Sequence, residues 1–496
     1  MGSGKFQLAS YGKQDNLFYK KPSITYFKTM YKKHTNFVTE SIPQQFNVKP
    51  DFGKKVTCVI GDIADLIGAT YLNVNLPPIG KFLDIPNESG SGNSNIACCA
   101  WGNKIGYRLI RNIEFELDDK VVERHTSDWF NVYEQLTVTL GLQRATDEII
   151  GNKEELYKFT NTKHGHLITI PLIFWFNRHP NMAFPIAAAY NTSVKINIEF
   201  NTLDNCLLLG PTHYMEINED ICTFEREDIL YQNVNGKLHY MKFIYYDELL
   251  KRLYYIKITN EEIVNTHKIC SYNINSQNVT VKGKERLYLN KKKYFSQILN
   301  LALGHTYLTV DYVFLGIQEK KAFIKHKLNY IINVMQYDNE KQIYHTNAKI
   351  KVNYSNPCTE FLFNCGQEYL HSGYMKDIFN YGSNILNQDE IIKSTELYMN
   401  GQPRYKELDM VYFNKIQSLL YHKRPASIGL GTYSFCLNVD DIQPSGYCNL
   451  TKMSDIEMKI KLNKNVSYDK NRPIKFKIYS RVLKCLTVEK GICNIE

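Results

Sequence analysis

The amino-acid sequence predicts an all-β protein made of two β-sandwiches, and three observations support this prediction. The chain has 496 residues, which is too long for one ordinary domain and suits two large domains that each bury a core. Its 36 Tyr and 25 Phe favour half-buried pleated sheets over long helices. Short apolar segments separated by turn residues recur along the chain, whereas a parallel α/β protein would place a helical segment after each strand.

The clearest predicted strand covers residues 194–200. Four apolar side chains from Val194 to Phe200 alternate strictly with Lys, Asn and Glu, so one side of this strand faces a core and the other faces water. Further segments with strand character are residues 56–60, 71–76, 113–117, 167–176, 307–315, 348–354, 360–363, 433–439, 456–462 and 474–488.

Two segments have helical character instead. Residues 127–142 begin with Ser127 as a helix cap and place Phe130, Tyr133 and Leu136 near one face, which predicts one amphipathic helix. Residues 318–335 alternate basic residues with apolar ones and separate two strand-rich regions, so we expect them to form a helical connection between domains.

These patterns divide the chain into an N-terminal arm (1–22), a first sandwich (23–316) and a second sandwich (317–496). Residues 201–304 are rich in Tyr and Lys and read as a long loop insertion in the first sandwich. The apolar runs 243–246 and 253–258 can give this insertion a small folded subdomain, and we expect it to form a tower at the outer end of the domain.

Charge and targeting signals restrict the class of protein. The net charge of +10 raises the possibility of a nucleic-acid partner, but the basic residues are scattered and no nucleic-acid motif accompanies them, so no specific nucleic-acid binding is expected. Twelve Cys without a Cys-x-x-Cys pair are expected to be reduced thiols. No secretory signal, lipidation motif or apolar run of spanning length occurs, which predicts a soluble protein.

Motifs of enzyme chemistry are not found. Gly90-Ser91-Gly92 and Gly429-Leu430-Gly431 lack the third glycine of a nucleotide fingerprint and are interpreted as turns. His164-Gly165-His166 offers two imidazoles, but no partner at ligand spacing, so we interpret it as a surface turn. We therefore assign no catalytic, cofactor-binding or metal-binding residue.

The most motif-like stretch is residues 443–449, and we interpret it as a structural turn formed by Pro444, Ser445 and Gly446. Pro444 presets a turn backbone and Gly446 permits a positive φ, so the stretch suits a loop between the strands 433–439 and 456–462.

Blocks along the chain resemble, in order, the major capsid proteins of nucleocytoplasmic large DNA viruses. In the first half the resemblance lies in Gln7-Leu8-Ala9-Ser10-Tyr11-Gly12, Pro22-Ser23-Ile24-Thr25-Tyr26-Phe27-Lys28, Phe52-Gly53-Lys54-Lys55-Val56, Asp128-Trp129-Phe130 and Ile170-Pro171-Leu172-Ile173-Phe174-Trp175-Phe176-Asn177-Arg178. In the second half it lies in Asn356-Pro357-Cys358-Thr359-Glu360-Phe361-Leu362, Met399-Asn400-Gly401-Gln402, Tyr412-Phe413-Asn414-Lys415-Ile416-Gln417 and Gln443-Pro444-Ser445-Gly446-Tyr447-Cys448-Asn449.

This resemblance implies two tandem jelly-roll sandwiches and a structural role without enzymatic activity. It further implies a homotrimer of pseudo-hexagonal outline that tiles an icosahedral shell in the virion, after assembly in the host cytoplasm. The partners it implies are neighbouring capsomers, minor capsid proteins and the inner viral membrane. Two alternatives stay open: a less abundant capsid paralogue at a vertex or accessory position, and a jelly-roll carbohydrate-binding protein.

Overall fold

A computed structural model describes residues 33–80, 96–288 and 301–495, apart from positions 220, 260, 266, 274, 275, 387, 465, 467 and 469–472. Before residue 33 it describes positions 9, 10, 12–16, 20, 21, 23, 25, 27–29 and 31. Most of the predicted arm and the Gly90-Ser91-Gly92 turn therefore lie outside the described residues. Among the described residues before Phe37, none belongs to a strand.

The first sandwich consists of two four-stranded antiparallel sheets. One sheet has the order β1 (Phe37–Gln44), β17 (Thr306–Leu315), β3 (Leu66–Leu76) and β7 (His166–Pro171). The other has the order β2 (Lys55–Val59), β8 (Val194–Phe200), β5 (Ile110–Leu117) and β6 (Lys120–Thr126). The strand predicted at residues 194–200 is confirmed, with Val194, Ile196 and Phe200 buried and Lys195 and Glu199 partly exposed. Asn197, which was expected to face water, is buried and hydrogen-bonds Thr57 and Glu116.

The second sandwich repeats this arrangement. Its first sheet has the order β18 (Leu328–Tyr337), β27 (Ile474–Glu489), β21 (Pro357–Gln367) and β24 (Leu430–Ser434), extended by β19 (Lys341–Ile343), β25 (Cys448–Asn449) and β28 (Ile492–Ile495). Its second sheet has the order β20 (Asn347–Lys351), β26 (Ile456–Leu462), β22 (Ile392–Met399) and β23 (Gln402–Asp409).

Both sandwiches thread their strands in the same way. Taken in chain order, the matching strands are β1 and β18, β2 and β20, β3 and β21, β5 and β22, β6 and β23, β7 and β24, β8 and β26, and β17 and β27. Each set of eight strands in two sheets is a jelly roll. The predicted all-β fold of two tandem jelly-roll sandwiches is therefore confirmed.

The segment between β8 and β17 is folded and is not a long loop. Its sheet has the order β15 (Val279–Thr280), β14 (Lys268–Ser271), β11 (Ile229–Val234), β12 (Lys237–Asp247), β13 (Arg252–Lys257), β10 (His213–Glu216) and β16 (Arg286–Leu287). A separate apolar core that includes Met215, Leu230 and Tyr255 stabilises it. The segment begins later than predicted, because β9 (Leu207–Gly210) pairs with β4 (Cys98–Trp101).

Two predicted helices have different bounds. The single helix expected at 127–142 is two helices, α4 (Ser127–Thr137) and α5 (Leu140–Ile150), and the hydroxyl of Thr126, not that of Ser127, caps α4. The helical connection expected at 318–335 stops early. Helix α10 (Ile317–Lys325) ends before β18, where Tyr330, Ile331, Ile332 and Val334 favour a strand.

Two predicted strands are shorter than expected. The strand at 167–176 ends with β7 at Pro171 and is followed by α7 (Trp175–Arg178), and the strand at 433–439 stops with β24 at Ser434. The other helices of the described residues are α3 (Ile105–Leu109), α6 (Glu154–Tyr157), η1 (Pro180–Met182), η2 (Ile186–Ala188), α8 (Leu203–Cys206), α11 (Glu368–Ser372), η3 (Tyr412–Gln417), α12 (Ser418–Tyr421) and η4 (Leu450–Lys452). Within the described ranges, no helix is long and apolar enough to cross a membrane.

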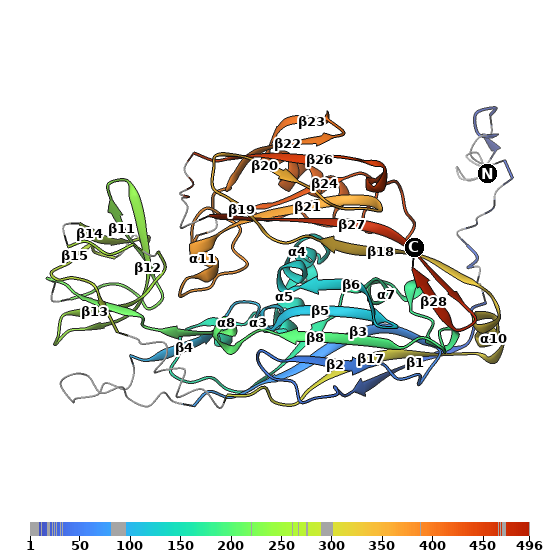
Figure 1. Cartoon of the computed structure of the whole chain (residues 1–496), viewed down its shortest axis with the longest axis horizontal. Helices are drawn as coiled ribbons and strands as arrows, with labels where there is room; N and C mark the ends of the chain where they lie inside the picture. The colour runs from blue at the N-terminus through green and yellow to red at the C-terminus, as the bar shows by residue number, and fades with distance from the viewer. Residues whose placement is uncertain are drawn as a thin grey trace.

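The two jelly rolls lie one against the other, with α4 between them (Figure 1). Strands β18, β21 and β27 form the side of the second jelly roll that is nearer to α4, and β22, β23 and β26 form the far side. The inserted sheet lies at one end of the molecule and packs against the second jelly roll through Tyr240, Ile258 and Leu370.

Candidate functional site

The contact between the two jelly rolls, which we call the junction, holds a group of buried charged residues. Strand β6 of the first jelly roll runs beside β18 of the second. The backbone N–H of Met335 donates to Oε1 of Glu123 at 3.2 Å, and Nη1 of Arg178 donates to the carbonyl of Asn333 at 3.0 Å. Side chains of the first jelly roll therefore satisfy backbone groups at the edge of the second.

Helix α4 supplies the apolar part of the junction. Trp129, Val132 and Leu136 pack against Leu362 and Tyr479, which project from the outer face of the β18-β27-β21-β24 sheet. Side chains alternate along a strand, so the neighbours of Leu362 and Tyr479 point into the sandwich core while these two point to the helix. The helix thus covers a sheet face that would otherwise expose large apolar side chains.

Asp128, in the first turn of α4, anchors the helix to the second jelly roll. Its buried carboxylate accepts hydrogen bonds from the hydroxyls of Tyr381, at 2.5 Å, and Tyr479, and from Nδ2 of Asn364 at 3.1 Å. Lys477 Nζ lies 3.5 Å away. Burial opposes the charge of Asp128, but Lys477 and these donors hold its pKa below the ordinary value.

A buried charged triad lies on the first side of the junction. Oε1 of Glu123 is 2.9 Å from Nε2 of His125 and 3.0 Å from Nη2 of Arg178. Burial lowers the pKa of His125, because the charged imidazolium is poorly solvated there. Burial pushes the pKa of Glu123 upward, but His125 and Arg178 hold it below its ordinary value. The guanidinium of Arg178 also lies over the ring of Tyr133.

A second triad of the same composition lies on the other side. Glu360 is 2.9 Å from Nε2 of His422 and 3.0 Å from Nη1 of Arg481, which also contacts Asp440 at 3.1 Å. Burial alone would lower the pKa of Arg481, but Glu360 and Asp440 raise it. The triads are not topological copies of each other, because Glu123 lies on β6 and Glu360 lies on β21.

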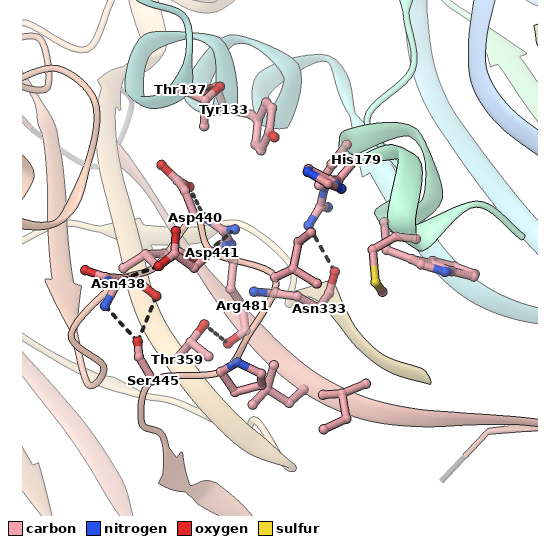
Figure 2. Close-up of a pocket in the computed structure, with 18 of the residues that line it drawn as sticks. Tyr133, Thr137, His179, Asn333, Thr359, Asn438, Asp440, Asp441, Ser445 and Arg481 are labelled. Atoms are coloured by element: carbon pink, nitrogen blue, oxygen red, sulfur yellow. Dashed lines mark hydrogen bonds and ion pairs between the residues drawn. The ribbon is translucent and has the colours of Figure 1, made fainter. Parts of the chain in front are cut away.

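A cavity of about 180 Å³ separates the two arginines. In Figure 2, Tyr133 and Thr137 of α4 form one wall, and Arg481 with Asp440 forms another. Pro444 and Ser445 of the predicted turn line the same cavity. The junction therefore includes the loop that follows β24.

The predicted turn residues Ser445 and Gly446 make hydrogen bonds and adopt a backbone conformation that suit a turn. The hydroxyl of Ser445 accepts from the backbone N–H of Asn438 at 2.7 Å and donates to its carbonyl at 3.0 Å. Gly446 has φ +143°, and a Cβ there would lie 3.2 Å from both the carbonyl of Phe435 and Cα of Cys436. The structural role of Pro444, Ser445 and Gly446 stays a prediction, with these contacts in its favour.

The acidic side chains of the junction lie within ion-pair distance of its basic ones, so these groups act on the orientation of the two jelly rolls. A buried charge that lost its partner would be costly, so the pairs favour one relative placement of the two jelly rolls. Within the described ranges, no three His, Cys, Asp or Glu side chains gather as metal ligands.

Sequence reasoning did not single out Glu123, His125, Glu360, His422 or Arg481 as site residues. A usable signal was present in two places. Arg481 stands in the middle of the predicted strand 474–488, and Glu360 opens the predicted strand 360–363. A charged residue inside a segment predicted to be a buried strand needs a partner, but only the fold identifies which residue that is.

Two family models match the chain, one on each half. Residues 25–247 match the model described as the major capsid protein N-terminus. Residues 319–493 match the model described as the large eukaryotic DNA virus major capsid protein.

Similar proteins and structures extend over nearly the whole chain. It is 32% identical to "Probable capsid protein 4" of Acanthamoeba polyphaga mimivirus, over 96% of this chain and 95% of that protein. It is 24% identical to the major capsid protein of Phaeocystis pouchetii virus, over 99% of each chain. Its fold is similar to that of the Faustovirus major capsid protein, with a TM-score of 0.68 and 11% identity over 95% of this chain and 94% of the other. Its fold is also similar to that of PBCV-1 VP54, with a TM-score of 0.65 and 18% identity over 95% of this chain and 99% of the other.

Proposed function

Because the chain belongs to the family of large eukaryotic DNA virus major capsid proteins, we propose that it is a structural subunit of the shell of an icosahedral virion. The observation that carries the proposal is the match of both halves to this family, together with two jelly rolls of identical strand order in one chain. A shell subunit must keep its two jelly rolls in one fixed arrangement so that it can pack regularly with its neighbours. The buried ion pairs of the junction favour a single placement of the two jelly rolls and support this role.

The finer proposal is a homotrimer. Three chains with two similar jelly rolls each would give six similar corners and a pseudo-hexagonal tile, which would contact neighbouring capsomers, minor capsid proteins and the inner viral membrane. Assembly would take place in the host cytoplasm. We expect no enzymatic activity and no specific nucleic-acid binding, and the mutual pairing of the junction's charged groups supports the first expectation.

The domain division carries over into this proposal. We propose that residues 23–316 and 317–496 are the two corners that each chain contributes, with the inserted sheet as an outer tower and residues 1–22 as an arm outside both. The pairing of β17 with β1 and β3 supports the boundary near residue 316. Antibody against the inserted sheet should label intact particles; labelling only after disruption would place the insertion inside the shell.

A second candidate is a less abundant capsid paralogue. The chain is 32% identical to "Probable capsid protein 4" and 22% identical to "Capsid protein 1" of the same mimivirus, so one virus carries at least two such proteins. The presence of two related capsid proteins in one virus keeps a paralogue as the second candidate.

Quantitative mass spectrometry of purified virions tests both candidates. The bulk tile would dominate the protein mass of the particle. A paralogue would be present at a small, fixed ratio to a more abundant relative. Complete absence from purified particles would contradict both proposals.

A further inference from the structure

The same helical motif follows the same strand in each jelly roll. Helix α4 begins directly after β6, and residues 410–421, which include η3 and α12, begin directly after β23, the strand that matches β6. Aligned at the strand ends, Trp129-Phe130-Asn131 coincides with Tyr412-Phe413-Asn414. Phe130 and Phe413 are both buried in the sandwich cores. The two segments, which we call the first and second junction helices, are therefore internal repeats.

The two repeats differ in what covers their outer face. Leu136, ten residues after the end of β6, is 2% exposed because it packs on the second jelly roll. Leu419, ten residues after the end of β23, is 69% exposed. Val411, Ile416 and Leu420 are exposed beside it. The second junction helix thus carries an apolar face of the kind that its repeat buries.

The surface that matches the first helix's binding face is also exposed. The first junction helix packs on the outer face of the β18-β27-β21-β24 sheet of the second jelly roll. The matching surface of the first jelly roll is the outer face of the β1-β17-β3-β7 sheet. On that face Leu167 is 51% exposed, and Tyr71 and Thr309 are partly exposed. The chain therefore presents a free helix on its second jelly roll and a free matching sheet on its first.

We infer that the second junction helix binds the outer face of the β1-β17-β3-β7 sheet of another copy of this chain. The internal repeat selects this occupant, because the equivalent helix already rests on the equivalent sheet within the chain. Such a contact joins two different surfaces head to tail, and it forms a closed ring when the rotation between copies closes. The inference rests on the proposed homotrimer, which it resolves to particular residues.

The polar chemistry of the two surfaces allows this contact. On the sheet, Nδ2 of Asn73 donates to the hydroxyl of Thr309 and Oδ1 of Asn73 accepts from the hydroxyl of Thr169, both at 2.8 Å. These groups satisfy one another, so a covering helix would leave few of them without a partner. The second junction helix has Val411 at the position of Asp128, so the helix brings no carboxylate of that kind to the contact. On the sheet, the carboxylate of Asp311 already accepts a hydrogen bond from the hydroxyl of Ser41 at 2.5 Å.

The test is the mass of the purified full-length chain in solution, by native mass spectrometry or light scattering, for the wild type and three variants. Leu419→Glu changes the helix and Leu167→Glu changes the sheet, and each should weaken the trimer about tenfold or more. Leu249→Glu, at a 95% exposed position of the inserted sheet, is the matched control and should leave the trimer intact. All three should keep the circular dichroism spectrum of the wild type.

The outcomes separate this inference from the proposed function. A monomeric wild type would refute the homotrimer and the inference together. A trimeric wild type whose Leu419→Glu and Leu167→Glu variants stay equally trimeric would overturn the inference alone. If Leu419→Glu fails to fold, Leu420→Ser at the exposed neighbouring position takes its place under the same criterion.

Discussion

The first and second junction helices follow matching strands and share a Phe-Asn pair, yet the outer face of one is buried and that of the other is exposed. The first contacts the other jelly roll through Trp129 and Leu136 and is fixed there by Asp128. The second has Leu419 in solvent and Val411 in place of the carboxylate. The first copy of this repeated helix thus forms a contact within the chain, whereas the second copy leaves the equivalent apolar face exposed.

The difference between the two helices lies mainly in polarity. Inside the chain, a buried carboxylate with hydroxyl and ammonium partners imposes direction on the contact, because any displacement leaves a buried charge unpaired. The second helix presents mostly apolar side chains, which stabilise a contact without such a penalty for separation. A permanent contact within the chain and a contact formed during assembly therefore place different demands on the same motif.

Removal of the anchoring carboxylate is the most damaging change we predict. Asp128→Ala leaves the hydroxyls of Tyr381 and Tyr479 and the ammonium of Lys477 without their acceptor, and it should lower the free energy of unfolding by about 3 to 5 kcal/mol. Urea unfolding measures the loss. The control is Val411→Ala at the matching exposed position, which should change stability by less than about 0.5 kcal/mol. Equal losses in the two variants would contradict the contrast between the helices.

The paired leucines give a matched comparison. Leu136→Ala should destabilise the isolated subunit by about 2 to 5 kcal/mol, because it opens a cavity in a packed contact. Leu419→Ala should change the same quantity by less than about 0.5 kcal/mol and should weaken association instead. Both are measured by urea unfolding at a concentration where the protein is monomeric. A large loss from Leu419→Ala in the monomer would show that its face is already covered within the chain.

The loop that lines the junction cavity offers a smaller test. Gly446→Val places a β-branched side chain at φ +143° against the backbone of Phe435 and Cys436, and it should cost about 1 to 3 kcal/mol of stability. Gly401→Val is the control for positive φ alone, since Gly401 has φ +74° and no atom within 4 Å of a Cβ there. If Gly446→Val left thermal stability unchanged but removed a ligand or an activity, the turn interpretation would be wrong.

Acid should weaken the first side of the junction gradually. The pKa of His125 is lowered by burial, so its contribution to stability is complete above the ordinary value of about 6.5 and is lost as pH falls below it. The pKa of Glu123 is also low, because His125 and Arg178 outweigh burial, so its contribution is lost below about pH 4.3.

The unfolding temperature of the wild type should therefore drop between about pH 7.5 and about pH 5.5. The variant His125→Gln should show a shallower drop over the same interval. Identical slopes for the two proteins would mean that His125 is not the group that responds to pH.

Strand periodicity and the ordered family-like blocks were enough to predict the fold class. The strict alternation of residues 194–200 identified β8 correctly, because side-chain period two is a local property of a half-buried strand. Residues 328–335 were wrongly predicted to continue the helix, because the basic and apolar residues of 318–327 have a helical pattern that was extended too far. Pairing with β27, which is far away in sequence, stabilises β18 instead.

The junction was not predictable from local pattern. Asp128 was named from the sequence only within the family-like block Asp128-Trp129-Phe130, and its partners come from residues more than 200 positions further along the chain. The exposed face of the second junction helix could not be predicted from the sequence either. Leu136 and Leu419 occupy matching positions after matching strands, but only Leu136 is buried in the structure. Burial by another part of the fold distinguishes them, and no residue near either one in sequence reports it.

Site-specific photo-crosslinking from Leu419 tests the central claim most directly. A photoreactive phenylalanine analogue would replace Leu419 in full-length protein, and a mixture of ¹⁴N- and ¹⁵N-labelled chains would distinguish contacts within a chain from contacts between chains. We predict crosslinks between chains, to peptides that contain β1, β3, β7 or β17. Crosslinks confined to one chain, or between chains but only to the second jelly roll, would contradict the proposed pairing of the two repeats.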